Sequence, residues 1–325
     1  MNFFSWKCLG WVLLLAVLII APIGRGGYII SVLSLWLVYS IAAMGLNLTL
    51  GYAGQISLAQ ASFMAIGAYV SALLSMAGWP WLTTVPFSLL AAFVVGILLG
   101  YPALRVQGHY LAFVTLAFNT LVFLVLRNED WLTGGIYGLS GMPRPNFSLF
   151  GFTLFDATQN LHFYYFILLL TVISALALWG IVRSPWGRAF KALRENPIRA
   201  ESLGLDTRRI TLLAFAIGSA YGGLSGAIMS PLVQFIDPAS FTFAQSLRIL
   251  LMVVVGGIGS FFGPFLGAAM AIILPEFMRF TDKYYLIIYA LAVIIVLIFS
   301  PKGLWGMVEN AGARIATWRK ARATS

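Results

Sequence analysis

The sequence predicts an all-α, polytopic bundle of transmembrane helices with about ten spans. Hydrophobic residues make up 61% of its 325 residues, charged residues only 9%, and the mean hydropathy is +0.93. A soluble chain carries roughly a quarter charged residues, so this composition excludes an ordinary water-soluble domain. The apolar residues form long runs separated by short polar segments, which is the pattern of helices that cross a bilayer.

Ten apolar runs define the expected spans. In chain order they cover residues 9–23, 28–50, 56–77, 81–104, 110–126, 163–182, 210–233, 246–263, 264–280 and 284–299. A straight crossing needs roughly 20 residues, so the shorter runs are expected to be bent or to cross only partly. The first run resembles a signal-peptide core, but no small-residue cleavage site follows it, and we interpret it as an uncleaved span. The whole chain, 1–325, is expected to form one membrane domain.

The distribution of Lys and Arg predicts one orientation. Ten crossings with the loop 183–209 inside place both termini in the cytoplasm, and the inside set is then Lys7, Arg105, Arg183, Arg188, Lys191, Arg194, Arg199, Arg208, Arg209, Lys302, Arg314, Arg319, Lys320 and Arg322. Six remain outside or at the outer edge: Arg25, Arg127, Arg144, Arg248, Arg279 and Lys283. The positive-inside rule and anionic lipid headgroups therefore explain the net charge of +10 without nucleic acid.

The segment 183–209 is a basic island in an otherwise apolar chain. Ser184 and Pro185 predict one helix start, Asn196 and Pro197 predict a second, and Gly204 is suited to end the second helix. One stripe of the first helix is apolar: Trp186, Phe190 and Leu193. Two short amphipathic helices would form an elbow on which another protein docks. The alternative is a solvated loop that only obeys the positive-inside rule.

Two further polar segments lie outside the spans. The external loop 127–162 contains TGGIYGLSGMPRP, which is too rich in Gly and Pro for a simple helix. The tail 301–325 places Trp305 and Trp318 beside basic residues, a pattern typical of an interfacial anchor on the cytoplasmic side. Glycine-rich stretches after Leu50 and Val255 suggest two related halves, as in transporters built from inverted repeats.

Polar residues gather in the segment 45–70, which is unusual for a lipid-facing helix. Gly51 and Gly54 would let the backbone break there. The polar side chains need partners inside the bilayer, and they are candidates to line a translocation path: Asn47, Thr49, Gln55, Ser57, Gln60 and Ser62. The alternative is that they hold helices together. In the segment 253–270, the pairs Gly259–Gly263 and Gly263–Gly267 favour close helix packing.

Several kinds of chemistry are missing from the sequence. No ionisable residue falls at the middle of an expected span, so no proton relay is evident. No GxxxxGK[ST] loop for nucleotide phosphates is present. The single cysteine, Cys8, and the separated His109 and His162 do not suggest a metal centre. We therefore expect no catalytic, cofactor or metal site; if ATP drives this protein, a separate subunit binds it.

The ordered motifs resemble the permease subunits of branched-chain amino acid ABC importers, the LivH/LivM family. They are GLNLTLGYAGQISLAQASFMAIGAY, TGGIYGLSG, GRAFKALRENPIRAESLGLD, VGGIGSFFGPFLGA and PKGLWG, and they run from the second span nearly to the end. The resemblance implies a type II-like permease in the bacterial inner membrane. It also implies a second related permease, two ATPase subunits that bind ATP and Mg²⁺, and an external binding protein facing the 127–162 loop.

The resemblance also assigns an ATPase-coupling role to the island. The expected coupling residues are Trp186, Arg188, Phe190, Leu193, Arg194, Glu195, Asn196, Ala200, Glu201 and Gly204. Only AESLG at 200–204 faintly matches the EAA-x3-G motif of many other importers, so their contacts do not transfer directly. Branched-chain amino acids are the expected solute; urea, short amides and aromatic acids are alternatives within the family. An ion-coupled secondary transporter acting alone is the alternative outside it, and a membrane enzyme is weaker because no catalytic groups cluster.

Overall fold

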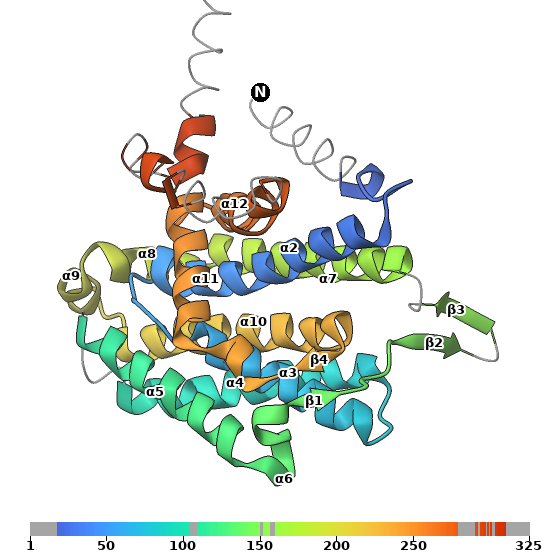
Figure 1. The fold of residues 1–325 in the computed structure, drawn as a ribbon. Coiled ribbons are helices and arrows are strands. Elements are labelled where there is room, and N and C mark those ends of the chain that lie inside the picture. Colours follow the sequence, from blue (N-terminus) through green and yellow to red (C-terminus); the bar gives the residue numbers. More distant parts are fainter. Residues whose placement is uncertain are drawn as a thin grey trace, which may run out of the picture.

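The computed structural model describes residues 18–103, 109–149, 152–156 and 160–278, together with 290–291, 293–296, 298, 300 and 303–309. The expected first and last spans, 9–23 and 284–299, and the tail 301–325 therefore lie wholly or largely outside the described residues. Within them the chain is helical apart from four short strands (Figure 1). The long helices are apolar throughout, and the chain is a multi-pass membrane protein.

Five helices are long and apolar enough to cross a membrane. They are α2 with its π-helical extension η1 (Gly27–Leu46 and Asn47–Tyr52), α4 (Trp81–Ala103), α5 (His109–Asn128), α7 (Asn160–Arg183) and α10 (Thr207–Val233). Three more apolar helices are shorter: α3 (Gln60–Met76), α11 (Phe243–Gly256) and α12 (Gly263–Phe277). These eight helices coincide with eight of the ten expected spans. A count of ten is not established by the described residues.

The helices α2 and α10 form the centre of the bundle. Both are largely buried, and α10 packs against α2, α3 and α4. Small residues permit this close approach: a methyl group added at Gly67 of α3 would overlap the Gly223 carbonyl of α10. Gly45 of α2 likewise lies against the Gly218 backbone and the Tyr221 side chain of α10. Membrane helices pack most tightly where small residues face each other, so this sequence places its glycines along the central contact.

Prolines inside the helices leave carbonyls that other helices use. A proline has no N–H, so the carbonyl four residues earlier loses its helical donor. Pro231 of α10 frees the Ala227 carbonyl in this way, and the buried Trp81 indole donates its Nε1–H to that oxygen at 3.1 Å. An unpaired backbone carbonyl is costly in lipid, so this bond stabilises the contact between the start of α4 and α10.

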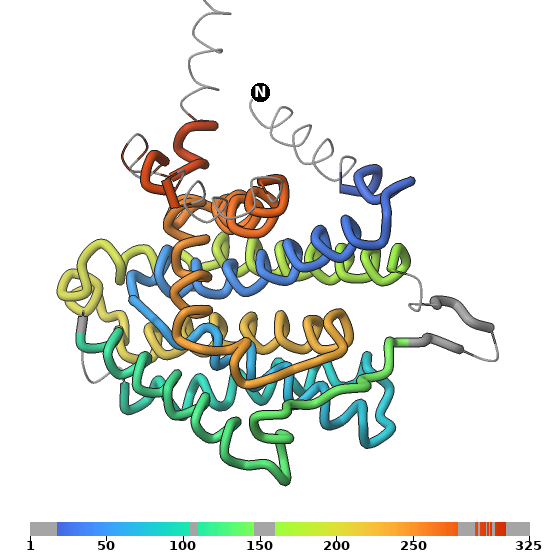
Figure 2. Tube along the Cα trace, viewed as in Figure 1, coloured from blue at the N-terminus to red at the C-terminus, as the bar shows by residue number. Residues whose placement is uncertain are grey.

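The two ends of the bundle differ (Figures 1 and 2). The elbow helices α8 (Pro185–Glu195) and α9 (Pro197–Ser202) lie at one end. At the other end the hairpin of β2 (Asn146–Leu149) and β3 (Phe152–Asp156) projects from the bundle. The short helices α6 (Asp130–Thr133) and η2 (Gly135–Tyr137) follow α5. The segment 127–162 thus forms no single helix, as its glycine content predicted.

A second antiparallel pairing joins the 127–162 segment to the chain that follows α10. Strand β1 (Leu139–Ser140) pairs with β4 (Phe235–Ile236), and the 3-10 helix η3 (Pro238–Phe241) then leads into α11. Figure 1 shows α11 running across α2 and α10 rather than alongside them. The expected span 246–263 is therefore wrong in its end: α11 stops at Gly256, because Gly257 and Gly259 take positive φ angles of 122° and 76° in a tight turn.

The glycine-rich segment packs as expected, with one correction. A methyl group at Gly267 of α12 would overlap the Met252 carbonyl of α11, and one at Gly256 would overlap the Gly263 carbonyl. Gly263 and Gly267 therefore mediate close helix packing. Gly259 does not take part in a helical pair, since it lies in the turn and contacts a different part of the chain.

Candidate functional site: the elbow and the helix break beside it

The two elbow helices begin and end where local sequence signals place them. Pro185 is the first residue of α8, and the Asn196 side chain accepts the Arg199 N–H at 3.0 Å to cap α9. Gly204, after the end of α9, has φ 83°. The expected Ser184 cap does not form, because α7 ends directly before it and the Ser184 hydroxyl donates to the Ile181 carbonyl of that helix at 2.6 Å.

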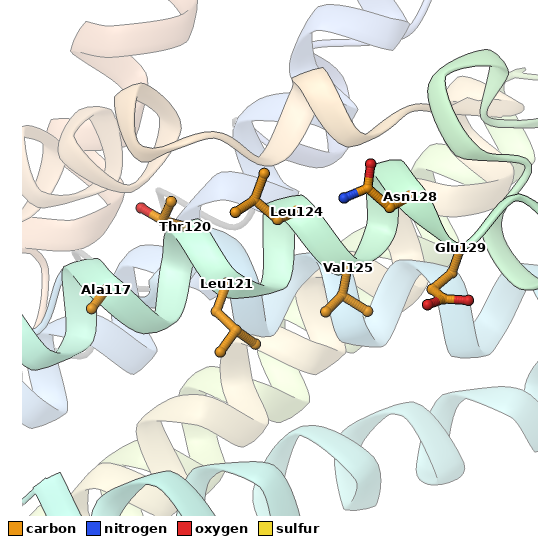
Figure 3. A pocket seen from close by; sticks show the side chains of 7 residues that line it. All are labelled: Ala117, Thr120, Leu121, Leu124, Val125, Asn128 and Glu129. Carbon is orange, nitrogen blue, oxygen red and sulfur yellow. The ribbon is translucent and has the colours of Figure 1, made fainter.

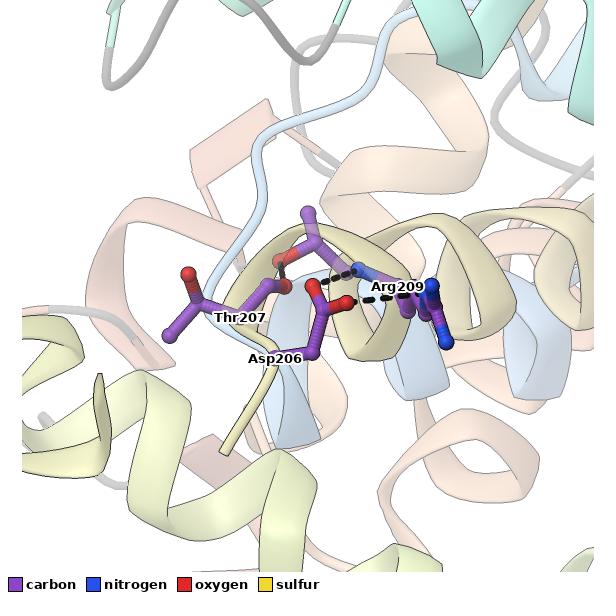
Figure 4. Close-up of polar contacts among 4 residues, drawn as sticks. Asp206, Thr207 and Arg209 are labelled. Carbon is purple, nitrogen blue, oxygen red and sulfur yellow. Dashed lines mark hydrogen bonds and ion pairs between the residues drawn. The ribbon is translucent and has the colours of Figure 1, made fainter. Parts of the chain in front are cut away.

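A further cap begins the long helix that leaves the elbow. The Asp206 carboxylate accepts the Arg209 N–H at 3.1 Å and pairs with the Arg209 guanidinium at 2.8 Å (Figure 4). Both side chains are largely exposed, so the ion pair adds little stability by itself. The cap, however, satisfies an N-terminal N–H of α10 and defines where the elbow ends.

The apolar stripe of α8 is used by this chain itself. Phe190 is fully buried and Leu193 nearly so, and α8 packs against α7, α10 and η1. The expectation that these two residues fill a groove of a partner is therefore wrong, because the bundle already covers them. Trp186, at 53% exposure, is the member of the stripe that remains accessible.

The exposed surface of the elbow is mixed in character. Ile198 and Leu203 are each 79% exposed, which is unusual for aliphatic side chains in a polar loop. Ala200, between them in the sequence, is buried. The exposed charged residues of α8 and α9 are Arg188, Lys191, Arg194, Glu195, Arg199 and Glu201.

The expected backbone break follows α2. The helix changes to π geometry over Asn47–Tyr52 and then loses helical structure before α3 begins at Gln60. Gly54 has φ 73°, and its Cα faces Arg194 so closely that an added methyl group would lie 3.1 Å from the Arg194 side chain. π-helical segments are rare and frequent at functional sites. The break therefore lies directly beside the elbow.

Three segments meet at this break, in what we call the coupling junction: Asn47, Gly51, Arg194, Gly259 and Ser260. The Asn47 amide donates to the Ser260 carbonyl at 2.8 Å and accepts the Gly259 N–H at 2.9 Å. The Arg194 guanidinium donates to the Gly51 carbonyl. One arginine of the elbow thus holds the end of the π-helix, and one asparagine holds the turn between α11 and α12.

A hollow of about 390 Å³ opens at the coupling junction. Its lining residues are Gly51, Tyr52, Lys191, Arg194, Glu195 and Gly259. Lys191 also lies over the Tyr52 ring, with its Nζ 5.9 Å from the ring centroid. Three charged side chains of α8 thus share the hollow with residues of the helix break and of the turn after α11.

The candidate path residues are buried within this chain. The Gln60 amide donates to the Ala42 carbonyl at 3.0 Å and the Gly218 carbonyl at 3.2 Å, which joins α3 to α2 and α10. Ser62 donates to Asn119 of α5 at 2.8 Å. Together with Asn47, these side chains have backbone or side-chain partners and exposures of 2% or less. The geometry at these three positions supports the packing interpretation.

Gln55 and Ser57 lie in the break itself. The Ser57 hydroxyl accepts the Ala59 N–H at 3.4 Å, which is a local turn contact. The Gln55 amide donates weakly to the Thr211 carbonyl at 3.4 Å, whereas its Oε1 is buried and has no hydrogen-bond partner among the described residues. Thr49, also buried, donates to the Gly45 carbonyl of its own helix at 3.0 Å. Of the six candidates, Gln55 thus retains an acceptor that a solute or a water molecule could use.

Asn119 and Ser246 form a polar centre that the sequence did not reveal. The Asn119 Oδ1 accepts hydrogen bonds from Ser62 at 2.8 Å and from Ser246 at 3.0 Å, and the Ser246 hydroxyl accepts the Ala61 N–H at 3.0 Å. The three helices α3, α5 and α11 therefore meet at one buried amide. An isolated asparagine in an apolar span is the only sequence signal, and it does not identify partners 57 and 127 residues away.

The outer face of α5 carries a second hollow, of about 520 Å³ (Figure 3). It is lined by Ala117, Thr120, Leu121, Leu124, Val125, Asn128 and Glu129. The lining is mainly apolar and lies on an exposed helix face, where an acyl chain or a neighbouring helix packs in a membrane. Within the described residues no group of three metal-ligating side chains occurs.

Comparison with known proteins identifies the family. The protein-family model described as the permease component of the branched-chain amino acid transport system matches residues 28–300 of this chain. The LivM permease protein of the high-affinity branched-chain amino acid transport system of Escherichia coli K12 is 37% identical over 86% of this chain and 70% of its own length. The Salmonella typhimurium LivM protein is 36% identical over 91% and 75%.

A more distant relative is the LivH permease protein of Escherichia coli, which is 27% identical over 83% of this chain and 92% of its own length. The chain is thus similar to both kinds of permease in those transport systems. No solved structure matches this chain. These relatives are transport permeases rather than enzymes, and the family match covers the elbow, the helix break and the turn described above. The chain belongs to the permease family of branched-chain amino acid transport systems.

Proposed function

We propose that this chain is one permease subunit of an ATP-driven importer for branched-chain amino acids in the bacterial inner membrane. It pairs with a second permease of the same family, and two ATPase subunits bind ATP and Mg²⁺ on the cytoplasmic side. An external binding protein delivers the solute to the end of the bundle that carries the β2–β3 hairpin. In this arrangement the chain has ten spans, with both termini and the elbow in the cytoplasm.

The observation that carries the proposal is the contact between Arg194 and the Gly51 carbonyl. An elbow that only obeyed the positive-inside rule would need no bond to the end of a π-helix. Here α8 is seated on the bundle through Phe190 and Leu193, and Arg194 reaches from it to the break. We infer that the ATPases engage the exposed tip around Ile198 and Leu203, with the neighbouring charges at the rim.

Movement of the elbow then reaches the spans through the coupling junction. A displacement of α8 moves Arg194, and through Gly51 it moves the turn at Gly259 that Asn47 holds. The turn connects α11 to α12, so those helices tilt with the elbow as a rigid body. We propose that the path runs between this chain and its partner permease, with Gln55 at its inner end. Asn47, Ser57, Gln60 and Ser62 support its wall from behind.

Reconstitution tests the proposal. The tagged chain is purified in mild detergent with its co-purifying proteins, and leucine uptake is measured in proteoliposomes with ATP inside or outside the vesicles. We expect an ATPase and a second permease in stoichiometric amounts and uptake that requires both ATP and the binding protein. A chain that purifies alone and moves leucine on an ion gradient without ATP would establish the secondary transporter instead. Competition by urea, a short amide or benzoate distinguishes the substrate alternatives.

A further inference from the structure

An exposed arginine lies on α11, close to the buried polar centre of Asn119 and Ser246. Arg248 is the sixth residue of this helix and is exposed, beside Leu247 at 39% and Phe243 at 39%. Its guanidinium makes one hydrogen bond, from Nη2 to the Ala271 carbonyl of α12 at 3.0 Å. It forms no ion pair with any residue that the structure describes.

Two independent observations place this part of α11 near the middle of the membrane. Ser246, two residues before Arg248, bonds to Asn119, which is the eleventh of the 20 residues of α5. Ile249, the residue after Arg248, is buried in the same apolar cluster as Tyr39, which is the thirteenth of the 26 residues of the Gly27–Tyr52 helix. Half of the hydrocarbon core is about 15 Å thick, so a side chain at the midpoint does not reach the headgroups.

One N–H group of the Arg248 guanidinium has a structural role in α12. Pro275 lies inside α12 and removes the N–H that would bond to the Ala271 carbonyl, four residues earlier. Arg248 supplies the missing donor. A guanidinium has five N–H groups, however, and this role uses one of them. The remaining donors and the positive charge are left on an exposed face at mid-membrane depth, so the expectation that Arg248 lies at the outer edge of a span is wrong.

A charge in that position is costly unless it meets water or an opposite charge. An arginine at the centre of a membrane helix is strongly unfavourable when it faces lipid, and such residues face a cavity or a partner. We propose that Arg248 is a carboxylate-binding residue on the face of this chain that lines the solute path.

A carboxylate is the anion that the planar guanidinium fork matches best, since two parallel N–H groups meet two oxygens. This inference rests on the proposed function, because an amino acid brings its own α-carboxylate to such a site. An acidic side chain of the partner permease has the same chemistry and is the other possible source. If the carboxylate comes from the solute, position 248 is reached from water. If it comes from the partner permease, the charge at position 248 is needed for assembly.

The first experiment separates carboxylate binding from the cap on α12. Leucine uptake by the complete importer is compared for Arg248→Met, Pro275→Ala and the double variant. We expect Arg248→Met to lower uptake at least tenfold and Arg248→Lys to lower it less. Pro275→Ala restores the backbone donor, so the Ala271 carbonyl no longer needs Arg248. Uptake that stays low in the double variant supports carboxylate binding, whereas recovery to the level of Pro275→Ala shows that Arg248 is only a cap and overturns the proposal.

The second experiment identifies the source of the carboxylate. Cys8 is the only cysteine, so Arg248→Cys in a Cys8→Ser background carries a single thiol. We expect it to react with a charged, water-soluble thiosulfonate, and leucine to slow that reaction. The control is Ile173→Cys, on the exposed face near the middle of α7, which we expect to remain unreactive. A thiol at 248 that is protected from the reagent, combined with loss of the partner permease on Arg248→Met, assigns the carboxylate to the partner.

A thiol that does not react, in a variant that assembles normally, overturns the proposal. A failure of the proposed function is distinguished by the wild-type complex, whose vesicles would then show no ATP-dependent leucine uptake. Normal uptake by the wild type and by both Arg248→Met and the double variant refutes only the role of Arg248.

Discussion

Replacing Arg194 by methionine should uncouple ATP hydrolysis from solute uptake without unfolding the elbow. Methionine keeps much of the side-chain volume but cannot donate to the Gly51 carbonyl. The buried anchors Phe190 and Leu193 are untouched, and Asn196 still caps α9. The change therefore removes one connection between the elbow and the helix break while leaving the elbow seated on α7 and α10.

The size of the effect follows from the kind of bond that is lost. A hydrogen bond from a charged donor contributes about 1.5–3 kcal/mol, and solvent weakens it where the side chain is exposed, as Arg194 is. A value near 1.4 kcal/mol corresponds to a factor of about ten in an equilibrium. Coupling free energies between sites are typically about 1–3 kcal/mol, so the loss of this single bond removes a large part of the connection.

The assay measures leucine uptake and ATP hydrolysis in the same proteoliposomes. We expect the number of solutes moved per ATP to fall about tenfold for Arg194→Met, with hydrolysis retained. Arg208→Met is the matched control, because Arg208 is an exposed cation of the same basic island that lies on α10, outside the proposed docking tip, and its side chain makes no bond within the described chain. A wild-type ratio in Arg194→Met, or an equal fall in both variants, would refute the role of the junction.

Three further substitutions test the packing around the junction, each by thermal unfolding in detergent. Gln60→Leu removes both bonds to α2 and α10, so we expect a loss of about 1–3 kcal/mol, while unchanged stability with altered uptake would restore Gln60 to the path. Trp81→Phe leaves the carbonyl that Pro231 freed with only the longer bond from Ser71 at 3.4 Å, and should cost about 1–2 kcal/mol. Gly67→Ala overpacks the contact with Gly223 and should cost about 1–3 kcal/mol; a silent substitution would mean that α3 and α10 are less closely packed.

Local signals predicted the elbow in detail, but its orientation could not be predicted. Pro185, Asn196 and Gly204 act through their own backbone geometry, so each marks a helix end without reference to the rest of the chain. The period of Phe190 and Leu193 identifies an apolar face, yet periodicity carries no information about what covers that face. The same stripe would serve a partner or the chain itself, and here the bundle is close enough to bury it.

Hydropathy likewise found the eight apolar helices that the structure describes, five of them long enough to cross a membrane, but misplaced the end of α11. It counts Gly256 to Gly259 as part of an apolar run, although positive φ angles end α11 there. The polar centre at Asn119 was also missed, because it depends on helices that are distant in sequence. Contacts between residues a few positions apart could be predicted from this sequence. Contacts between helices that are distant in the sequence could not.

Two of the helix-internal prolines show why an arginine on α11 calls for a function. Pro231 and Pro275 each free one carbonyl inside an apolar helix, and each carbonyl accepts hydrogen bonds from a neighbouring helix. At Ala227 the donors are neutral: the buried Trp81 indole N–H at 3.1 Å and, at 3.4 Å, the Ser71 hydroxyl. That solution adds no charge to the membrane. At Ala271 the chain uses Arg248 instead, although one donor would suffice, and it thereby exposes a charge and unused donors at the depth where they are least favourable. The Ala271 carbonyl does not account for the positive charge or for the remaining N–H groups of Arg248. A carboxylate of the solute or of the partner permease accounts for both.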